Sequence, residues 1–321
     1  MKKIFITGGA GYVGSKLVPK LLDLGYKVTV LDLMIYGADV LLNHDKLKKV
    51  KGDIRDKNLL EKIIPGHDVL IHLACISNDP SFELNPTLGK SINYDAFEPM
   101  VKISKKNNIN KFIYASSSSV YGIKKEKNVT EDMSLEPLTD YSKFKADCEK
   151  ILNNYKSEDF ITTTIRPSTV CGYAKRQRLD LVVNILTNHA FHNREIKVFG
   201  GDQLRPNVHI DDMVNSYLAI LNAESKKING QIFNVGFRNQ SVNELADDVK
   251  KVIGNDINIV NTKSDDNRSY HVSSEKIKDI LGFETKHTVK DAVLDLKNAF
   301  EKKLLTNTFN DEFFFNIKRM N

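Results

Sequence analysis

Residues 3–32 read KIFITGGAGYVGSKLVPKLLDLGYKVTVLD. The apolar runs Lys3 to Thr7 and Val28 to Leu31 predict two buried strands, and Ser15 to Leu24 carries apolar residues at helical spacing between them. Gly25 is typical of a helix C-terminus. The turn between the first strand and the helix is rich in glycine, at Gly8, Gly9, Gly11 and Gly14. The stretch therefore predicts a strand, a glycine turn, a helix and a second strand.

This order of elements is the unit that binds a dinucleotide. A glycine turn lets backbone N–H groups approach a pyrophosphate without a Cβ clash, and the helix N-terminus adds unpaired donors and partial positive charge. Asp32 ends the second strand, roughly 20 residues past the glycines, where a carboxylate accepts hydrogen bonds from both ribose hydroxyls. It would repel a 2′-phosphate, so we expect the cofactor to be NAD rather than NADP.

Composition limits the class of protein. The chain has 321 residues, of which 41% are hydrophobic and 27% charged, enough for one large or two modest domains with an ample core. The net charge of +6 fits a solvated lysine-rich surface or attraction of a phosphorylated substrate. Because the lysines are spread along the chain without a long basic run, we expect no nucleic-acid partner. No apolar stretch has transmembrane length, so we expect no membrane partner.

The cysteines and histidines form no recognisable ligand pattern. Cys75, Cys148 and Cys171 are odd in number and widely spaced, which indicates no disulfide framework and favours the cytoplasm. His189 and His192 lie three residues apart without accompanying acidic or cysteine residues. We therefore expect no metal site.

Further strands and helices alternate along the chain. Asp68 to Leu73 and Lys111 to Ser116 predict buried strands, with helices expected at Leu59 to Ile64 and Ser91 to Ser104. Such alternation indicates an α/β protein with a Rossmann-type, doubly wound parallel sheet. We expect a loop and weak helix between Asp32 and Val50, a loop from Cys75 to Leu88, and a packed core histidine at position 72.

The residues that carry chemistry follow the Lys111 to Ser116 strand. A run of serines at 116–119 lies at the strand end, where open parallel sheets bind ligands. Tyr141 and Lys145 are four residues apart on a helix that Thr139 or Asp140 would cap, so they share one face about 6 Å apart along the axis. Tyrosine has a pKa near 10, and a neighbouring ammonium group together with a positive nicotinamide ring would lower it. A tyrosinate could then take a proton from a sugar hydroxyl as hydride leaves the same carbon.

These motifs together resemble those of the extended short-chain dehydrogenase/reductases, and in particular the NAD-dependent nucleotide-sugar epimerase/dehydratase family. The resemblance runs from Thr7 to about Phe283. Its motifs are TGGAGYVG, GDIRD, HLA, SSVYG, YSKFK, LRPNVHIDD and DDNRSYHVSSEKIKDILGF. The run RLDLVVN, residues 178–184, also resembles a subgroup that oxidises GDP-heptoses at C4.

The resemblance implies roles for individual residues. Tyr141 would be the catalytic base, Lys145 its partner and a ribose ligand, and Ser117 the catalytic serine. Asp32 and Asp53 would bind the adenosine, and Ile54 would pack on the adenine. The remaining cofactor contacts are expected at Gly8, Gly11, Tyr12, Val13, Gly14, Leu73, Ala74, Asn93 and Ser116.

The resemblance also places the substrate. Ser118 and Ser119 stand where 4,6-dehydratases carry Asp-Glu, so dehydration is disfavoured. Thr169 replaces the asparagine that usually touches the substrate. Residues expected to contact a sugar or a diphosphate are Ser118, Ser119, Thr169, Arg176, Arg178, Arg205 and Arg268. For Arg176 and Arg178 the alternative is that they lie on a solvated loop face.

The predicted reaction begins with hydride transfer from a nucleotide-diphosphate sugar to NAD, most simply at C4. Return of the hydride to the other face makes the chain an epimerase; release of the keto sugar and NADH makes it a 4-dehydrogenase, for example on a GDP-heptose. A non-catalytic NAD-binding scaffold is the second alternative, although such proteins usually lack the tyrosine–lysine pair.

The domain organisation is predicted from the same resemblance. Residues 1–170, with 207–236 returning to them, would form the NAD-binding domain, and 171–206 with 237–321 a smaller α/β domain for the nucleotide sugar. Relatives pair through helices that start near Ser91 and Tyr141, so we expect a homodimer. The phenylalanine-rich tail, from Thr306, is expected to pack back on the body or on a partner subunit.

Overall fold

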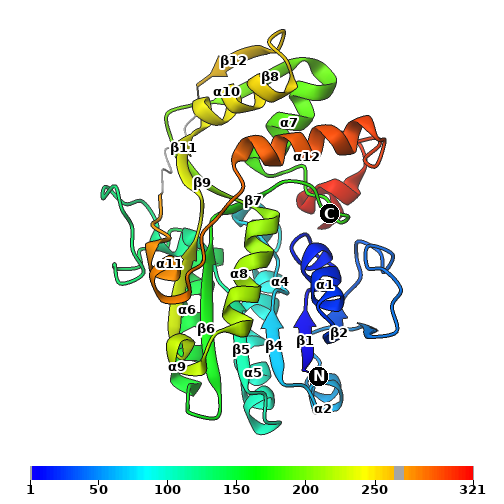
Figure 1. The fold of residues 1–321 in the computed structure, drawn as a ribbon, viewed down its shortest axis with the longest axis vertical. Helices are drawn as coiled ribbons and strands as arrows, with labels where there is room; N and C mark the ends of the chain where they lie inside the picture. Colours follow the sequence, from blue (N-terminus) through cyan, green and yellow to red (C-terminus); the bar gives the residue numbers. More distant parts are fainter. Residues whose placement is uncertain (1, 264–270, 321) are drawn as a thin grey trace.

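The computed structural model describes residues 2–263 and 271–320, which form two lobes (Figure 1). The larger lobe is built on a seven-stranded sheet of order β10-β6-β5-β4-β1-β2-β3, in which all neighbouring strands run parallel. Its strands are β1 (Lys3–Thr7), β2 (Lys27–Asp32), β3 (Leu47–Lys51), β4 (Val69–His72), β5 (Lys111–Ala115), β6 (Ile161–Pro167) and β10 (Gln231–Val235). This arrangement confirms the predicted doubly wound fold.

Helices cover both faces of this sheet. Successive side chains of a strand point to opposite faces, so in β1 Ile4 and Ile6 pack against one helical layer and Phe5 against the other. The first layer contains α1 (Gly14–Asp23), α8 (Ile210–Asn222) and α11 (Glu275–Leu281). The second contains α2 (Lys57–Ile63), α5 (Phe97–Lys106) and α6 (Asp140–Tyr155).

The smaller lobe is also of the α/β class. One sheet has the order β11-β9-β7 and a second pairs β12 with β8. The strands are β7 (Thr169–Cys171), β8 (Glu195–Phe199), β9 (Leu204–His209), β11 (Arg238–Ser241) and β12 (Asn258–Thr262). Three helices, α7 (Val182–Asn193), α10 (Val242–Ile253) and α12 (Val289–Glu301), pack together into a separate apolar core.

Short elements complete the chain: α3 (Asp79–Glu83), α4 (Pro86–Lys90), η1 (Ser91–Asp95), η2 (Ser118–Tyr121), α9 (Ser225–Ile228), η3 (Glu312–Phe314) and α13 (Asn316–Met320). The prediction of a loop from Cys75 to Leu88 is therefore wrong, because α3 lies within this stretch and α4 begins in it. Asn78 and Asn85 cap these helices by accepting from backbone N–H groups, and a proline follows each cap within the first turn. The weak helix expected before β3 is absent from the described residues of that loop.

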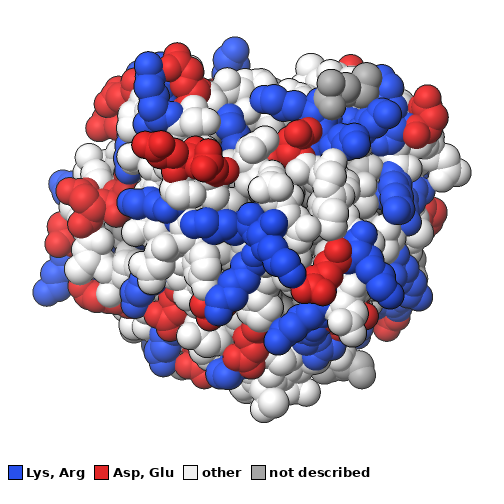
Figure 2. All heavy atoms as spheres, turned by 90° about the horizontal axis from the view of Figure 1, so that it is seen from below, with Lys and Arg blue, Asp and Glu red and all other residues white. Residues whose placement is uncertain are grey.

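The carboxyl ends of the large sheet's strands face the smaller lobe (Figure 1). The opposite end is seen in Figure 2, where Lys and Arg are interspersed with Asp and Glu over the visible face. Within residues 2–263 and 271–320, no helix combines the length and apolar character needed to cross a bilayer.

Candidate active site

The glycine turn lies tightly against the end of β4. Gly8 has φ +74°, and a Cβ added there would meet the Ala74 backbone nitrogen at 2.5 Å. A Cβ on Gly14 would meet the Gly9 carbonyl oxygen at 2.4 Å. Helix α1 begins at Gly14, and Val13 before it gives no side-chain cap to the first N–H groups. A cradle that side chains would fill, next to uncapped backbone donors, fits a pyrophosphate.

Asp32 is held against this turn. Its carboxylate accepts from the Ala10 N–H at 3.0 Å and the Met34 N–H at 2.8 Å. Burial raises the pKa of Asp32, while those two bonds and the charge of Arg176 act to lower it. A half-buried carboxylate at the end of β2 fits the ribose of NAD.

Asp53 and Ile54 follow the neighbouring strand β3. Arg55 binds the Asp53 carboxylate through Nη2 at 2.6 Å, and this bond lowers the pKa of Asp53. Ile54 is buried. Asp53 is therefore an ionised, arginine-paired acid, and its contact with an adenine stays a prediction.

Tyr12 joins the glycine turn to the smaller lobe. Its ring packs with Ala174 and Ile210, its hydroxyl donates to the Gly172 carbonyl, and it accepts from Asn184 at 3.0 Å. Because this side chain is already engaged, any contact of Tyr12 with the cofactor falls to its backbone. Val13 likewise packs against the apolar core.

The Asn93 side chain fixes the loop after β4 through hydrogen bonds to its backbone. Leu73 and Ala74 are half-buried at the strand end, and the Asn93 side chain binds Ile76 twice, accepting from its N–H at 2.8 Å and donating to its carbonyl at 2.9 Å. Asn93 thus positions the loop on which the centre of the cofactor would lie. His72 is a packed core residue, as predicted: it bonds Thr7 and stacks on Tyr114.

Tyr141 and Lys145 lie on the first turns of α6, which Thr139 starts with a capping box. The Lys145 Nζ is 5.8 Å from the centre of the Tyr141 ring and donates to the Ala115 carbonyl at 2.7 Å. Ser117, two residues past the end of β5, lies close enough to the Tyr141 hydroxyl to lower its pKa. The structure therefore brings together the three residues predicted to be catalytic.

Burial dominates the pKa of Tyr141 in the protein alone. It raises this pKa, Cys75 and Asp79 raise it further, and Arg178 and Ser117 act in the opposite direction. The lysine instead engages a backbone carbonyl. The lowering of this pKa by Lys145 together with a bound nicotinamide ring therefore stays a prediction.

The serines at positions 116–119 have different surroundings. The Ser116 hydroxyl donates to Glu149, which also forms a buried ion pair with Arg166 at 2.6 Å. Ser119 lies beside Ser117, with 2.8 Å between their hydroxyl oxygens. Ser118 is buried. The Ser116 side chain therefore serves the core, which leaves only its backbone for the predicted cofactor contact.

The structure separates the two loop arginines. Arg178 is 8% exposed; it binds Asp180 at 2.9 Å and Ser77 at 3.2 Å, and its charge reaches Tyr141. Arg176 is 1% exposed and stacks on the Tyr36 ring at 3.6 Å, close enough to Asp32 to lower its pKa. Arg178 thus lies toward Tyr141 and Arg176 toward Asp32, and neither forms a solvated loop face. Their contacts with substrate stay predictions.

Two further predicted substrate residues, Thr169 and Arg205, lie on strands of the smaller lobe. Thr169 begins β7 and pairs with Asn207 of β9. Arg205 lies on the same strand β9 and donates to the Leu204 carbonyl at 3.1 Å. Arg268 lies outside the described residues.

Three residues of the site were missed: Tyr36, Ser77 and Asn316 of the C-terminal tail. Asn316 contacts Tyr36 at 2.9 Å and Ser77 at 2.8 Å. The tail packs back on the body, as predicted, and buries Phe314. Nothing near Asn316 in the sequence indicates its partners, which are more than 130 residues away in the chain.

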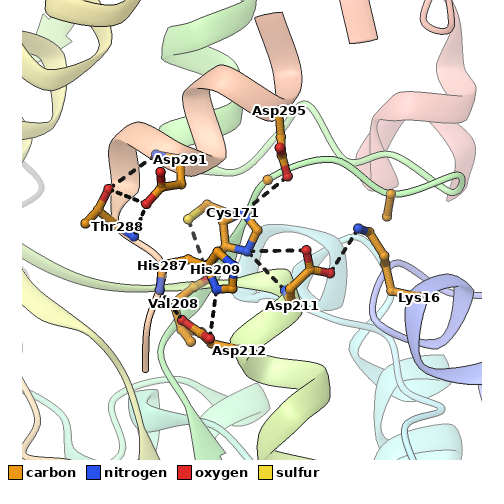
Figure 3. Close-up of polar contacts among 12 residues, drawn as sticks. Lys16, Cys171, Val208, His209, Asp211, Asp212, His287, Thr288, Asp291 and Asp295 are labelled. Atoms are coloured by element: carbon orange, nitrogen blue, oxygen red, sulfur yellow. Dashed lines mark hydrogen bonds and ion pairs between the residues drawn. The ribbon is translucent and has the colours of Figure 1, made fainter. Parts of the chain in front are cut away.

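A histidine and aspartate group joins the lobes near the start of α8 (Figure 3). Among described residues, His209, Asp211 and His287 lie close enough together to hold a metal ion. Most of their polar atoms have partners, however: Asp211 pairs with Lys16 at 2.9 Å, His287 with Asp212 at 2.9 Å, and His209 Nδ1 accepts the Asp211 N–H at 3.1 Å. The buried His209 Nε2 makes no hydrogen bond in the described part of the chain, but it lies 3.3 Å from the Asp295 carboxylate. The two imidazole rings stack at 4.6 Å. We therefore assign these residues to lobe packing rather than to a metal site.

Comparison with known proteins gives consistent matches. A family model described as NAD dependent epimerase/dehydratase family matches residues 4–236. A UDP-glucose 4-epimerase of Lactobacillus helveticus is 28% identical over 91% of this chain and 94% of its own. A putative UDP-glucose 4-epimerase of Methanocaldococcus jannaschii is 33% identical over 78% of this chain and 82% of its own. The crystal structure of a UDP-glucose 4-epimerase from Thermotoga maritima, with UDP-glucose, has a TM-score of 0.86 at 26% identity and covers 94% of this chain and all of that one.

Proposed function

Because the chain belongs to the NAD dependent epimerase/dehydratase family, we propose that it is a nucleotide-sugar 4-epimerase. The observation that carries this proposal is the cluster of Ser117, Tyr141 and Lys145 at the sheet edge that also holds the glycine turn and Asp32. The curated relatives named above are UDP-glucose 4-epimerases, which makes a UDP-hexose the first substrate to test.

The chain's residues divide the work of the reaction. Bound NAD supplies a hydride acceptor and a positively charged ring. Tyr141 takes the proton of the C4 hydroxyl and later returns it, while Ser117, beside the same phenol, orients the substrate oxygen. Arg178 adds positive charge near the phenol and favours its ionised form.

Two neighbouring reactions need different groups. Dehydration at C5 and C6 needs an acid and a base where this chain has Ser118 and Ser119, and a serine hydroxyl does neither task near neutral pH. Net oxidation at C4 needs only the same three residues and free exchange of NADH. The 4-dehydrogenase reading therefore remains the alternative, and it differs from epimerisation in the fate of the hydride.

We also propose a division of labour between the lobes, with NAD on the larger lobe and the nucleotide sugar held by Arg178, Thr169 and Arg205. Three unpaired cysteines support a reducing compartment, the cytoplasm.

The reaction is tested by incubating the purified protein and NAD with UDP-, GDP-, CDP- and dTDP-sugars that carry deuterium at C4. We expect the C4 epimer with its deuterium retained, and no accumulation of NADH. Keto sugar with an equivalent amount of NADH would instead identify a 4-dehydrogenase.

Tyr141→Phe should lower turnover by about 10²- to 10⁴-fold while NAD binding persists, because only the proton transfer is removed. Tyr155→Phe is the matched control: Tyr155 lies at the far end of the same helix and donates to Glu98. Unchanged turnover in Tyr141→Phe would favour the scaffold alternative.

A further inference from the structure

The C-terminal tail, residues 313–320, crosses the loops that surround the cofactor site. Its anchor is Asn316, which is 4% exposed and bonds three separate loops. The Asn316 Oδ1 accepts from the Tyr36 hydroxyl at 2.9 Å and from Arg176, and its Nδ2 donates to the Ser77 hydroxyl at 2.8 Å. Its backbone N–H donates to Asp180 at 3.0 Å. One residue therefore ties together the loop after β2, the loop after β4 and the arginine loop.

Residues on both sides of Asn316 make further contacts with the loops around the site. Phe313 packs edge-on against Tyr36 at 6.0 Å, and Arg319 donates to the Ile35 carbonyl at 3.0 Å. Met320 packs on the cluster that contains Phe82 and Tyr141. The tail thus reaches from the Asp32 side of the site to the catalytic tyrosine, and Figure 1 shows the C-terminus between the lobes, beside α1.

The arginine under the tail lacks a full set of partners. Arg176 is 1% exposed and bonds only neutral acceptors, the Asn316 amide and the Gln177 carbonyl. Its Nε has no hydrogen-bond partner among the described residues, and neither does Arg178 Nη2. Arg178 has an anionic partner in Asp180, whereas Arg176 hydrogen-bonds no carboxylate among the described residues. A buried cation without an anionic partner is costly, which points to an anionic ligand beside Arg176. The pyrophosphate of a dinucleotide, bound next to Asp32, has the required charge.

From these contacts we propose that the tail is a strap that retains the nicotinamide cofactor through the reaction, with Asn316 as its positioning residue. The inference rests on the proposed function, because an epimerase must return the hydride it has taken. If NADH leaves first, the keto sugar is stranded. A strap across three loops slows release of NADH and so commits the intermediate to reduction.

The experiment measures the dissociation of NADH from the full-length protein by displacement with excess NAD, without any sugar. Asn316→Ala removes side-chain bonds to three loops, so we expect dissociation to accelerate roughly tenfold or more. Removal of residues 313–321 should accelerate it further. Lys318→Ala is the matched control, because the Lys318 Nζ donates to Phe309 within the same segment; its dissociation rate should equal that of the wild type.

The second readout is the ratio of released keto sugar to epimer during turnover. The ratio should rise in Asn316→Ala and stay at the wild-type value in Lys318→Ala. Circular dichroism and the melting temperature establish that each variant is folded. If Asn316→Ala does not fold, Met320→Ala, at the partly buried end of the tail, carries the same two measurements.

Two results overturn the strap. One is an unchanged NADH dissociation rate in the shortened protein; the other is slower dissociation, which would mean that the tail competes with the cofactor. Failure of the proposed function is distinct from either. A wild-type protein that epimerises no sugar, yet loses NADH faster when shortened, would retain the strap and lose the epimerase assignment.

Discussion

At the residue scale, burial changes the chemistry of the titratable side chains more than their sequence neighbours do. The pKa of Tyr141 is raised because its phenol is buried, although a lysine lies one helical turn away. Arg176 shows the same effect with the opposite sign, since burial lowers its pKa to about 10. Both residues are poised for a charged ligand that offsets the cost of burial.

His72 gives a pH prediction at this scale. Burial, and then the charge of Lys145, lower the pKa of His72 to about 3, against about 6.5 in an unfolded chain. Between these values the unfolded chain binds a proton that the folded protein does not, so this group's contribution to stability is lost as the pH falls from about 6.5 toward 3. The free energy of unfolding should drop by up to about 1.4 kcal/mol per pH unit from this residue.

The measurement is chemical denaturation of the wild type and His72→Gln at several pH values in this window. The variant is expected to be less stable at neutral pH, where it loses packing against Tyr114, but to show a shallower pH dependence. Parallel curves for the two proteins would contradict the assignment.

At the element scale, Gly8 in the glycine turn and Gly25 at the end of α1 have similar φ values but different structural roles. Gly8 and Gly25 have φ values of +74° and +88°. A Cβ on Gly8 would meet the Ala74 backbone, whereas nothing lies within 4 Å of a Cβ on Gly25. Gly25 therefore serves helix termination, while Gly8 also permits the close approach of two loops.

The matched substitutions Gly8→Ala and Gly25→Ala test this difference. Gly25→Ala should cost about 1 kcal/mol of stability, from backbone strain alone, with unchanged NAD affinity. Gly8→Ala must also push apart the turn and the loop after β4, so we expect NAD binding to be lost or greatly weakened. Isothermal titration calorimetry with NAD, alongside thermal melts, gives both quantities; equal NAD affinities in the two variants would refute the argument.

At the scale of the whole molecule, contacts between distant segments assemble the site. Tyr12 reaches from the glycine turn to Gly172, and Lys16 of α1 pairs with Asp211 of α8 beside the stacked His209 and His287. The tail adds a third connection through Asn316. The same contacts therefore hold the lobes together and shape the site, so a substitution at Tyr12, Lys16 or Asn316 should change both the lobe packing and the site geometry.

The oligomeric state is the remaining prediction at this scale. We expect a homodimer that forms through α5 and α6, the two helices that lie side by side on one face of the large sheet. Sedimentation equilibrium at micromolar concentration should give twice the monomer mass. A single monomeric species under those conditions would exclude this arrangement.

The sequence by itself determined the large sheet, the glycine turn, Asp32 at the end of β2 and the helix that carries Tyr141 and Lys145. These features depend on local patterns: buried apolar runs, glycines at a turn, and a capping box. Short helices such as α3 were missed because an asparagine cap followed by proline is a weak signal in a loop.

Only the tertiary structure decided the surroundings of those residues. It buried the Tyr141 phenol, separated Arg176 from Arg178, and placed Asn316 against loops that lie 136 to 280 residues earlier in the chain. Burial and charge depend on atoms brought together from distant parts of the chain, and no local pattern encodes those distances. The predicted site residues can therefore be recognised from the sequence, whereas their ionisation and their burial follow from the packing of the whole chain.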